Sequence, residues 1–232
     1  MILRQLFDAE TSTYTYLLGD PETQLAAIID PVREQAERDL RLIGELGLRL
    51  AYVFETHVHA DHVTAADTLR QRTGARTVAF TTGAPCADIA VTDGTDIAVG
   101  ELQVRVIATP GHTDDSVSYA VAGRVFTGDA LLVRGTGRTD FQNGDPGTLY
   151  DSITGKLFAL PDATLVYPGH DYKGHTMSTI GEEKAHNPRI AGKTRDQFIA
   201  LMRTLGLPPP KNLAVAVPQN RECGRTAVPQ AV

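Results

Sequence analysis

The stretch "THVHADH", residues 56–62, places three histidines and an aspartate close together in a chain that has seven histidines in all. The apolar run Leu48–Phe54 before it is typical of a buried strand, and Val63–Arg72 after it has a helical pattern. Residues two apart face the same way only in extended backbone, so His57 and His59 can share a site only if the strand continues into an extended loop. The pattern therefore predicts a polar site at a strand end, where α/β folds usually hold their ligands.

Asp61 and His62 close the motif at the point where the next helix is expected to begin. Aspartate is a favourable residue at the start of a helix, and the helix dipole also favours a carboxylate there. We therefore expect Asp61 to cap this helix. Together with His57 and His59, the motif supplies four side chains with nitrogen or oxygen donors.

Three further apolar runs end in a short glycine turn followed by one residue of the same kind. "VIATPGH" ends at His112, "RVFTGD" at Asp129 and "TLVYPGH" at His170. Imidazole and carboxylate donors without thiolate suit Zn, Fe or Mn, at one metal or at a pair ~3.5–4 Å apart. Because all the donors of a two-metal hydrolase are present, spacing alone favours dinuclear zinc.

Composition restricts the class of protein. With 232 residues and 42% hydrophobic residues, the chain is long enough for a folded domain with a sizeable core. Its net charge is −6 and its Lys and Arg residues are scattered, so no nucleic-acid partner is expected. The N-terminus lacks the apolar core of a signal peptide, and no run approaches the ~20 apolar residues of a membrane span, which predicts a cytoplasmic protein without a membrane partner.

Cys86 and Cys223 are the only cysteines, and they lie far apart in the sequence. Neither belongs to a C-x-x-C pair. We expect two reduced thiols without a structural role.

Strands and helices alternate along the chain, which predicts an α/β layered sandwich. Residues 1–207 are expected to form one domain, and residues 208–232 an irregular C-terminal extension packed on it. Early strands are predicted at Ile2–Phe7, Thr13–Leu18 and Gln24–Ile29, and later helices at Gly147–Ala159, Thr179–His186 and Arg195–Leu205.

The motif set H-x-H-x-D-H, His112, Asp129 and His170 resembles the metallo-β-lactamase superfamily. That resemblance implies an αββα sandwich of two mixed β-sheets packed face to face with helices outside. The stretches "RGTGRTDFQNGDPGTLYDSI", "PGHDYKG", "EEKAHNPRI" and "AVPQNRECG" further resemble the persulfide dioxygenases. These non-haem iron enzymes oxidise glutathione persulfide with O2 and water to sulfite and glutathione in sulfide detoxification.

The resemblance implies a site with one Fe(II) per chain. His57, His112 and Asp129 would be the metal ligands and the catalytic residues. The residues implied to orient these ligands, or to hold a second metal in the alternative below, are His59, Asp61, His62 and His170. The candidates for binding glutathione carboxylates and its amine are Arg138, Asp140, Tyr172 and Arg189.

The alternative is a glyoxalase II-type hydrolase that cleaves hydroxyacylglutathione thioesters with two zinc ions or mixed metals. In those enzymes a Phe-Glu stretch typically follows the Gly-Arg pair, whereas this chain has "TDFQ" there. That difference favours the dioxygenase. The family resembled often forms homodimers, so a homodimer is the expectation that the resemblance carries. The sequence itself does not show whether a separate sulfurtransferase of the rhodanese type is a partner, and no such domain is fused here.

Overall fold

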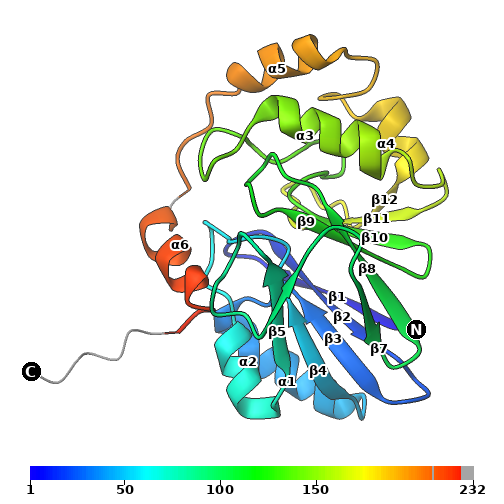
Figure 1. Cartoon of the computed structure of the whole chain (residues 1–232), viewed down its shortest axis with the longest axis vertical. Helices are drawn as coiled ribbons and strands as arrows, with labels where there is room; N and C mark the ends of the chain where they lie inside the picture. Colours follow the sequence, from blue (N-terminus) through cyan, green and yellow to red (C-terminus); the bar gives the residue numbers. More distant parts are fainter. Residues whose placement is uncertain (211, 226–232) are drawn as a thin grey trace, which may run out of the picture.

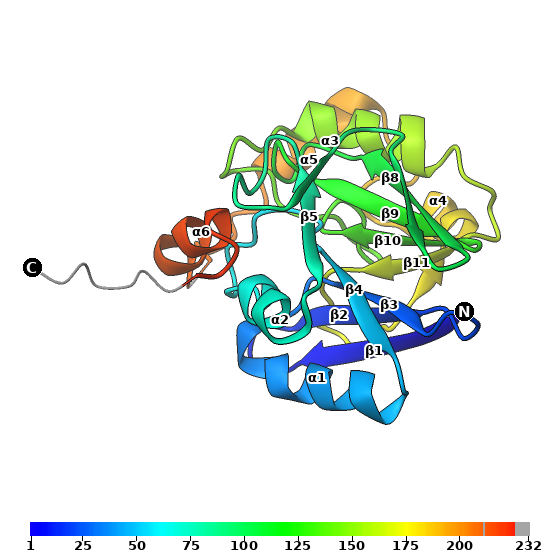
Figure 2. The same cartoon turned by 60° about the horizontal axis from the view of Figure 1, so that its bottom comes forward.

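A computed structural model describes residues 1–210 and 212–225. Two six-stranded sheets pack face to face, with helices on their outer sides (Figure 1). Figure 2 shows the four layers stacked on one another, with α3 and α5 on one side of the sandwich and α1 on the other. The predicted αββα sandwich with two mixed sheets is confirmed.

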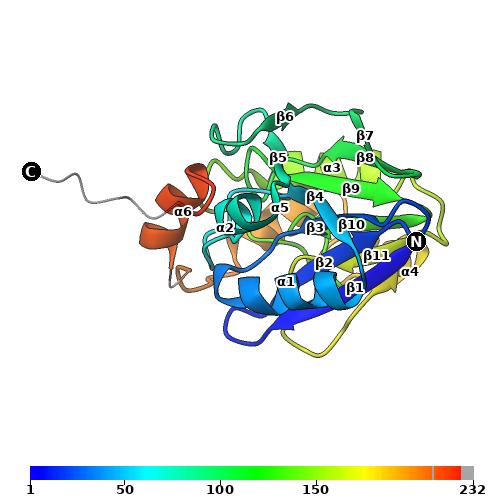
Figure 3. The same cartoon turned by 90° about the horizontal axis from the view of Figure 1, so that it is seen from below.

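The first sheet has the strand order β1-β2-β3-β4-β5-β6. The first three strands form an antiparallel meander, and the remaining strands are parallel to β3. Parallel neighbours need a crossover connection, and α1 and α2 supply two of them on the outer face (Figure 3). The elements are β1 (Ile2–Asp8), β2 (Thr13–Gly19), β3 (Leu25–Ile29), α1 (Ala36–Glu45), β4 (Arg49–Phe54), α2 (Ala66–Thr73), β5 (Arg76–Phe80) and β6 (Ile89–Val91).

The second sheet has the order β12-β11-β10-β9-β8-β7, with β10 and β11 parallel and the other neighbours antiparallel. Helices α3, α4 and α5 cover its outer face through one apolar cluster. The elements are β7 (Asp96–Val99), β8 (Leu102–Ala108), β9 (Val117–Val121), β10 (Arg124–Gly128), α3 (Pro146–Ser152) with a π-helical continuation (Ile153–Leu157), β11 (Leu165–Pro168), β12 (Ser178–Thr179), α4 (Ile180–His186) and α5 (Arg195–Arg203).

The core between the sheets combines aliphatic side chains with pairs of aromatic rings. Tyr16 packs against Phe126 and Phe54 against Tyr119, each pair with ring centroids 4.9 Å apart. Both tyrosine hydroxyls donate to backbone carbonyls near the edge of the sandwich, Tyr119 to Glu55 at 2.7 Å and Tyr16 to Pro168 at 2.6 Å. Each tyrosine belongs to one sheet and its acceptor to an element of the other, so these bonds fix the sheets relative to one another.

The C-terminal segment differs from the prediction. Residues 208–232 were expected to be irregular, but α6 (Leu213–Arg221) forms there, beside α2 in Figures 1–3. The expectation of two reduced thiols is wrong, because Cys86 and Cys223 form a disulfide. The part of the extension after residue 225 lies outside the described residues.

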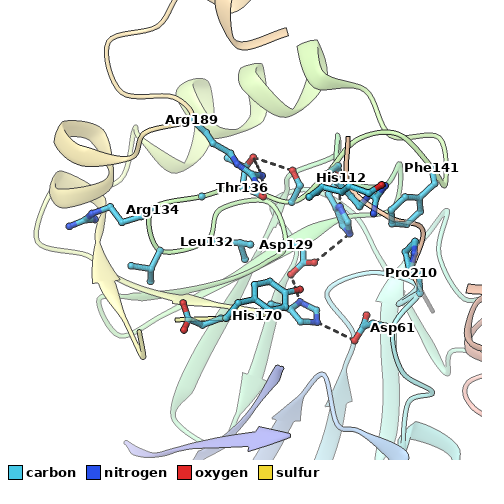
Figure 4. Close-up of a pocket in the computed structure, with 18 of the residues that line it drawn as sticks. Asp61, His112, Asp129, Leu132, Arg134, Thr136, Phe141, His170, Arg189 and Pro210 are labelled. Atoms are coloured by element: carbon cyan, nitrogen blue, oxygen red, sulfur yellow. Dashed lines mark hydrogen bonds and ion pairs between the residues drawn. The ribbon is translucent and has the colours of Figure 1, made fainter. Parts of the chain in front are cut away.

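The start of α2 also differs. Asp61 was expected to cap this helix, but the helix begins at Ala66, after Ala65. Residues 57–65 form a longer loop than the periodicity indicated, and Asp61 points into the candidate site (Figure 4). Within residues 1–210 and 212–225, no helix has the length and apolar character that a membrane crossing requires.

A buried carboxylate on α1 gives a prediction about stability. Asp39 is 1% exposed, and burial raises its pKa from 3.8 to about 6 despite the neighbouring Arg38. Because the folded pKa exceeds the unfolded one, ionisation of Asp39 destabilises the fold progressively between about pH 4 and 6 and fully above that range. We expect Asp39→Asn to raise the free energy of unfolding by about 3 kcal/mol at pH 7.5 and to have little effect at pH 4. Urea titrations at both pH values test this, and an equal gain at both would contradict it.

Candidate metal centre

Three side chains from separate strand ends meet at one edge of the sandwich. His57 follows β4 of the first sheet, whereas His112 and Asp129 follow β8 and β10 of the second. One donor atom from each lies within 4.8 Å of the others. All three residues were predicted as metal ligands, and the structure brings them together.

Hydrogen bonds at the outer nitrogens orient the two imidazoles. His112 Nδ1 lies 2.7 Å from the carbonyl oxygen of Arg138, so Nδ1 carries the proton and donates. His57 Nδ1 lies 3.0 Å from Thr56 Oγ1, whose hydroxyl proton is directed to Asp30 Oδ2 at 2.7 Å. In both rings this leaves the Nε2 lone pair free for a metal.

Burial supports the neutral form of one of these ligands. Desolvation, and then the positive charges that His59 and His112 could carry, hold the pKa of His57 well below its usual range. A metal-binding imidazole must be neutral. His57 is therefore ready to bind a cation at neutral pH without first losing a proton.

Asp129 is ionised and is oriented by His170. Burial opposes ionisation, but the charge and the hydrogen bond of His170 hold the pKa of Asp129 below its usual range. His170 Nδ1 lies 2.7 Å from Asp129 Oδ1, which leaves Oδ2 on the side of His112 Nε2, 3.6 Å away (Figure 4). Asp129 therefore presents one carboxylate oxygen to the same point as the two imidazoles.

His170 itself links two carboxylates. Its Nε2 lies 3.1 Å from Asp61 Oδ2, so both ring nitrogens face an acidic partner (Figure 4). Burial would lower the pKa of His170, but the charges of Asp129 and Asp61 raise it well above its usual value. The same Asp61 oxygen also lies 3.1 Å from Thr13 Oγ1 and 2.8 Å from His62 Nδ1. In this arrangement, both ring nitrogens of His170 and the Oδ2 atom of Asp61 contact other side chains of the same protein.

His59 does not join the group formed by His57, His112 and Asp129. Its Nε2 lies 3.1 Å from Asp30 Oδ1 and 3.4 Å from Glu55 Oε2, and these two acids raise the pKa of His59 although burial lowers it. Asp30 and Glu55 were not among the predicted site residues, because Asp30 precedes a proline and resembles an ordinary turn residue. Glu55 stands directly before the motif, and only its position could have drawn attention to it.

His112 and Asp129 line a pocket of about 510 Å³, whereas His57 lies outside its lining. Its wall includes Phe141 and the run Leu207–Pro210. The pocket is lined by Ala60, Asp61, His112, Asp129, Leu132, Val133, Arg134, Gly135, Thr136, Gly137, Arg138, Phe141, His170, Asp171, Tyr172, Lys173, Arg189 and Leu207–Pro210. A cavity of this size is suited to a small-molecule ligand.

The chain is similar to known proteins in sequence. The sequence profile of the Metallo-beta-lactamase superfamily matches residues 9–85 and 87–170. The human protein "Persulfide dioxygenase ETHE1, mitochondrial" is 46% identical over 97% of this chain and 89% of its own length. The chain belongs to the persulfide dioxygenase family of the metallo-β-lactamase superfamily.

Solved structures agree with this family assignment. The crystal structure of ETHE1 from Myxococcus xanthus is 61% identical, covers 97% of this chain and 100% of its own, and superposes with a TM-score of 0.96. A metallo-β-lactamase from Staphylococcus aureus is 27% identical, with a TM-score of 0.88 over 100% of this chain and 75% of its own. The resemblance inferred from the motifs, and the fold it implied, are thereby confirmed.

Of the predicted substrate-binding residues, Arg138, Tyr172 and Arg189 line the pocket of this persulfide dioxygenase family member, whereas Asp140 does not. Arg138 forms two hydrogen bonds with Asp140, Nε to Oδ1 at 2.6 Å and Nη2 to Oδ2 at 2.7 Å. The ring of Tyr172 stacks parallel to that of His170 and remains 73% exposed. Their contacts with substrate stay a prediction.

Arg189 differs from Arg138 in having no acidic partner among the described residues. Its Nη1 donates to the backbone oxygen and the hydroxyl of Thr136 at the pocket wall (Figure 4). Burial lowers the pKa of Arg189. An anionic ligand group would supply the missing partner.

A glycine beside the ligands gives a test of their placement. Gly128 has a φ of +48°, and a Cβ there would lie 2.6 Å from Thr56 Oγ1, the partner of His57. We expect Gly128→Ala to displace His57 and the adjacent Asp129, and to reduce the metal bound per chain as measured by inductively coupled plasma mass spectrometry.

The matched control is Gly123→Ala. Gly123 also has a positive φ, +73°, but a Cβ there meets no atom within 4 Å. Both substitutions carry a backbone penalty of about 1–3 kcal/mol, and only the first contacts the site. Equal metal loss in both variants would show that Gly128 has no particular role in placing the ligands.

Proposed function

We propose that this protein is a persulfide dioxygenase that oxidises glutathione persulfide with O2 and water to sulfite and glutathione, using one Fe(II) per chain. The observation that carries the proposal is the group of His57, His112 and Asp129, each with its donor atom turned to one point, in a chain of this family. The reaction makes the protein an oxidoreductase.

The three donors fit iron. Two imidazoles and one carboxylate on one side of a metal leave further positions open, which is the arrangement of non-haem Fe(II) oxygenases. His57 and His112 would hold the ion through Nε2, and Asp129 through Oδ2, because hydrogen bonds engage the other donor atom of each group. When bound, the iron supplies the redox chemistry with O2 that no side chain can provide.

The family assignment supports the dioxygenase over the thioester hydrolase. A glyoxalase II-type site needs His170 and Asp61 as ligands of a second ion, and the donor atoms of His59, Asp61 and His62 lie within 4.8 Å of one another. Here both nitrogens of His170 face carboxylates, and Asp61 Oδ2 has three polar neighbours. We infer that these residues hold one another and leave the ion to His57, His112 and Asp129.

The pocket suits glutathione persulfide. The substrate has two carboxylates. Among the described residues, Arg189 is a cation without an acidic partner, and Arg138 also lines the pocket. Arg138 lies 5.1 Å from the ring centre of Phe141 and is held beside it. We infer that Arg189 and Arg138 bind the glutathione carboxylates, and that Asp140 and Tyr172 contact its remaining polar groups.

This placement directs the sulfur end of the substrate toward the metal ligands. The side chains of Leu132 and Phe141 and the run Pro208–Pro210 line the space beside His112 and Asp129. Apolar walls reduce the water around a reacting sulfur and strengthen electrostatic interactions there. The protein would thus bind the glutathione part through arginines and hold the persulfide in a drier region.

We propose a cytoplasmic protein, acting as a homodimer, with a separate rhodanese-type sulfurtransferase that supplies or consumes persulfide. Its human relative carries "mitochondrial" in its name. In either compartment, glutathione would be available to accept the sulfur that such a sulfurtransferase transfers.

Metal and oxygen assays test the reaction. We expect protein reconstituted anaerobically with Fe(II) to hold about one iron per chain and to consume O2 with glutathione persulfide, but not to hydrolyse S-lactoylglutathione. His112→Ala removes one of three ligands, so iron content and O2 uptake should both fall at least ~100-fold. Two metals per chain together with thioester hydrolysis without O2 uptake would overturn the proposal.

A second prediction concerns substrate binding. Arg189→Gln should raise KM for glutathione persulfide roughly ten-fold or more with little change in kcat, because one charge-assisted hydrogen bond to a carboxylate is lost. Arg203→Gln, on the exposed side of α5, is the control. An unchanged KM in Arg189→Gln would exclude a role for this residue in substrate binding.

A further inference from the structure

The loop that carries the H-x-H-x-D-H motif is held from behind by α6. Asn220, in the last turn of this helix, is 4% exposed. Its Nδ2 donates to the carbonyl oxygens of His59 at 2.9 Å and His62 at 2.8 Å. Its Oδ1 accepts from the backbone N–H of Thr64 at 2.9 Å. One side chain therefore satisfies three buried backbone groups of the loop.

A second contact lies at the start of the same helix. Asn212 Nδ2 donates to the carbonyl oxygen of Asp61 at 2.6 Å. Beyond the helix, the carbonyl oxygen of Cys223 accepts from the backbone N–H of Asp67 at 2.9 Å, at the start of α2. The contacts from residues 212–223 thus extend along the loop from His59 to Asp67.

The helix has little stability of its own. It contains nine residues with Pro218 inside, and no side chain caps its N-terminus. Isolated helices of this length are unstable in water, and an internal proline removes a hydrogen bond. Its position therefore depends on tertiary links.

The strongest link is the disulfide between Cys223 and Cys86, which lies in the connection between β5 and β6. The two cysteines are 137 positions apart in sequence, so the bond ties the end of the chain to the first sheet. Cys86 is partly exposed, whereas Cys223 is 4% exposed. An incoming thiol therefore reaches the Cys86 sulfur first.

We propose that α6 is a thiol-responsive clamp on the metal-binding loop. Asn220 is the positioning residue that holds the loop, and the Cys86–Cys223 disulfide holds Asn220 in place. The inference rests on the proposed function in one respect, that this loop belongs to the reaction site. Disulfides are rare in reducing compartments, and those that occur there are usually transient or regulatory, which agrees with the proposed setting.

The chemistry is thiol–disulfide exchange with a low-molecular-weight thiol, of which glutathione, the proposed product, is an example. Its thiolate attacks the Cys86 sulfur and forms a mixed disulfide, while Cys223 leaves as a thiolate and takes up a proton. A second thiolate attacks the thiol's sulfur in that mixed disulfide and releases Cys86 as the second thiol. Two electrons reduce the protein, and two small thiols become one small disulfide.

Reduction would release α6 and withdraw Asn220 from the loop. The carbonyl oxygens of His59 and His62 and the N–H of Thr64 would then lack a buried partner, which favours loosening of the backbone beside His57. A thiol signal would thus reach the metal affinity of the site.

The first experiment uses the unmodified full chain and Co(II) as the probe, because its visible spectrum reports ligand geometry independently of turnover. Thiol titration under denaturing conditions should find no free thiols before treatment with glutathione and both cysteines free afterwards. After treatment, the Kd for Co(II) should rise ~10-fold, as expected for the loss of contacts that orient metal ligands. Hydrogen exchange should increase in residues 57–67 and stay unchanged in β9.

The second experiment separates the clamp from general stability. Asn220→Ala should raise the Kd for Co(II) to the level of the reduced protein while the disulfide stays intact, and thiol treatment should then add no further loss. Gln219→Ala is the matched control, because Gln219 belongs to the same helix but contacts Arg33 instead of the loop. Cys86→Ser should reproduce the reduced state without any thiol.

Several outcomes would overturn the clamp. These are two free thiols in protein kept from reductants throughout, a Kd for Co(II) that does not change on reduction, or an oxidised Asn220→Ala variant that binds Co(II) like the unmodified protein. Neither experiment measures turnover. A working clamp in a protein without O2 uptake would refute only the proposed function, and normal O2 uptake with thiol-insensitive metal binding would refute only the clamp.

Discussion

The hydrogen bonds of two core tyrosines fix the two segments that lead to His57 and His170. Tyr119 belongs to the second sheet and binds the carbonyl oxygen of Glu55, two residues before His57. Tyr16 belongs to the first sheet and binds the carbonyl oxygen of Pro168, two residues before His170. Because the candidate ligands come from both sheets, they meet only while the sheets keep this register. The aromatic core therefore sets the distances between ligands as well as the stability of the domain.

Hydrogen bonds outside the ligand group then decide which atoms face a metal. The donors of a two-metal site are all present, and their spacing in the sequence favoured that interpretation. In the structure, His170 lies between two carboxylates, and His59 Nε2 lies close to Asp30 and Glu55. Whether a residue is a ligand thus depends on what occupies its other atoms, which spacing does not encode.

Much of the fold was predictable because the strands have clear apolar patterns and each candidate ligand follows one of them. The start of α2 and the existence of α6 were not predictable in the same way. Helix α6 lacks a capping side chain and contains Pro218, so it is stabilised by contacts with the distant motif loop. The pairing of Cys86 with Cys223 likewise depends on proximity in space, and Asp30 acts through a fold that brings β3 beside β4.

The run Pro208–Pro210 gives the pocket wall a property that other residues would not. Proline has a fixed φ angle and no backbone N–H, so this wall has few conformations available and offers a ligand no main-chain donor. An empty pocket therefore keeps its width on this side, and a substrate loses little conformational entropy of the protein on entering. The wall thus restricts the size of the ligand, and discrimination by charge falls to the arginines, of which Arg138 donates to the carbonyl oxygen of Pro208 in this same wall.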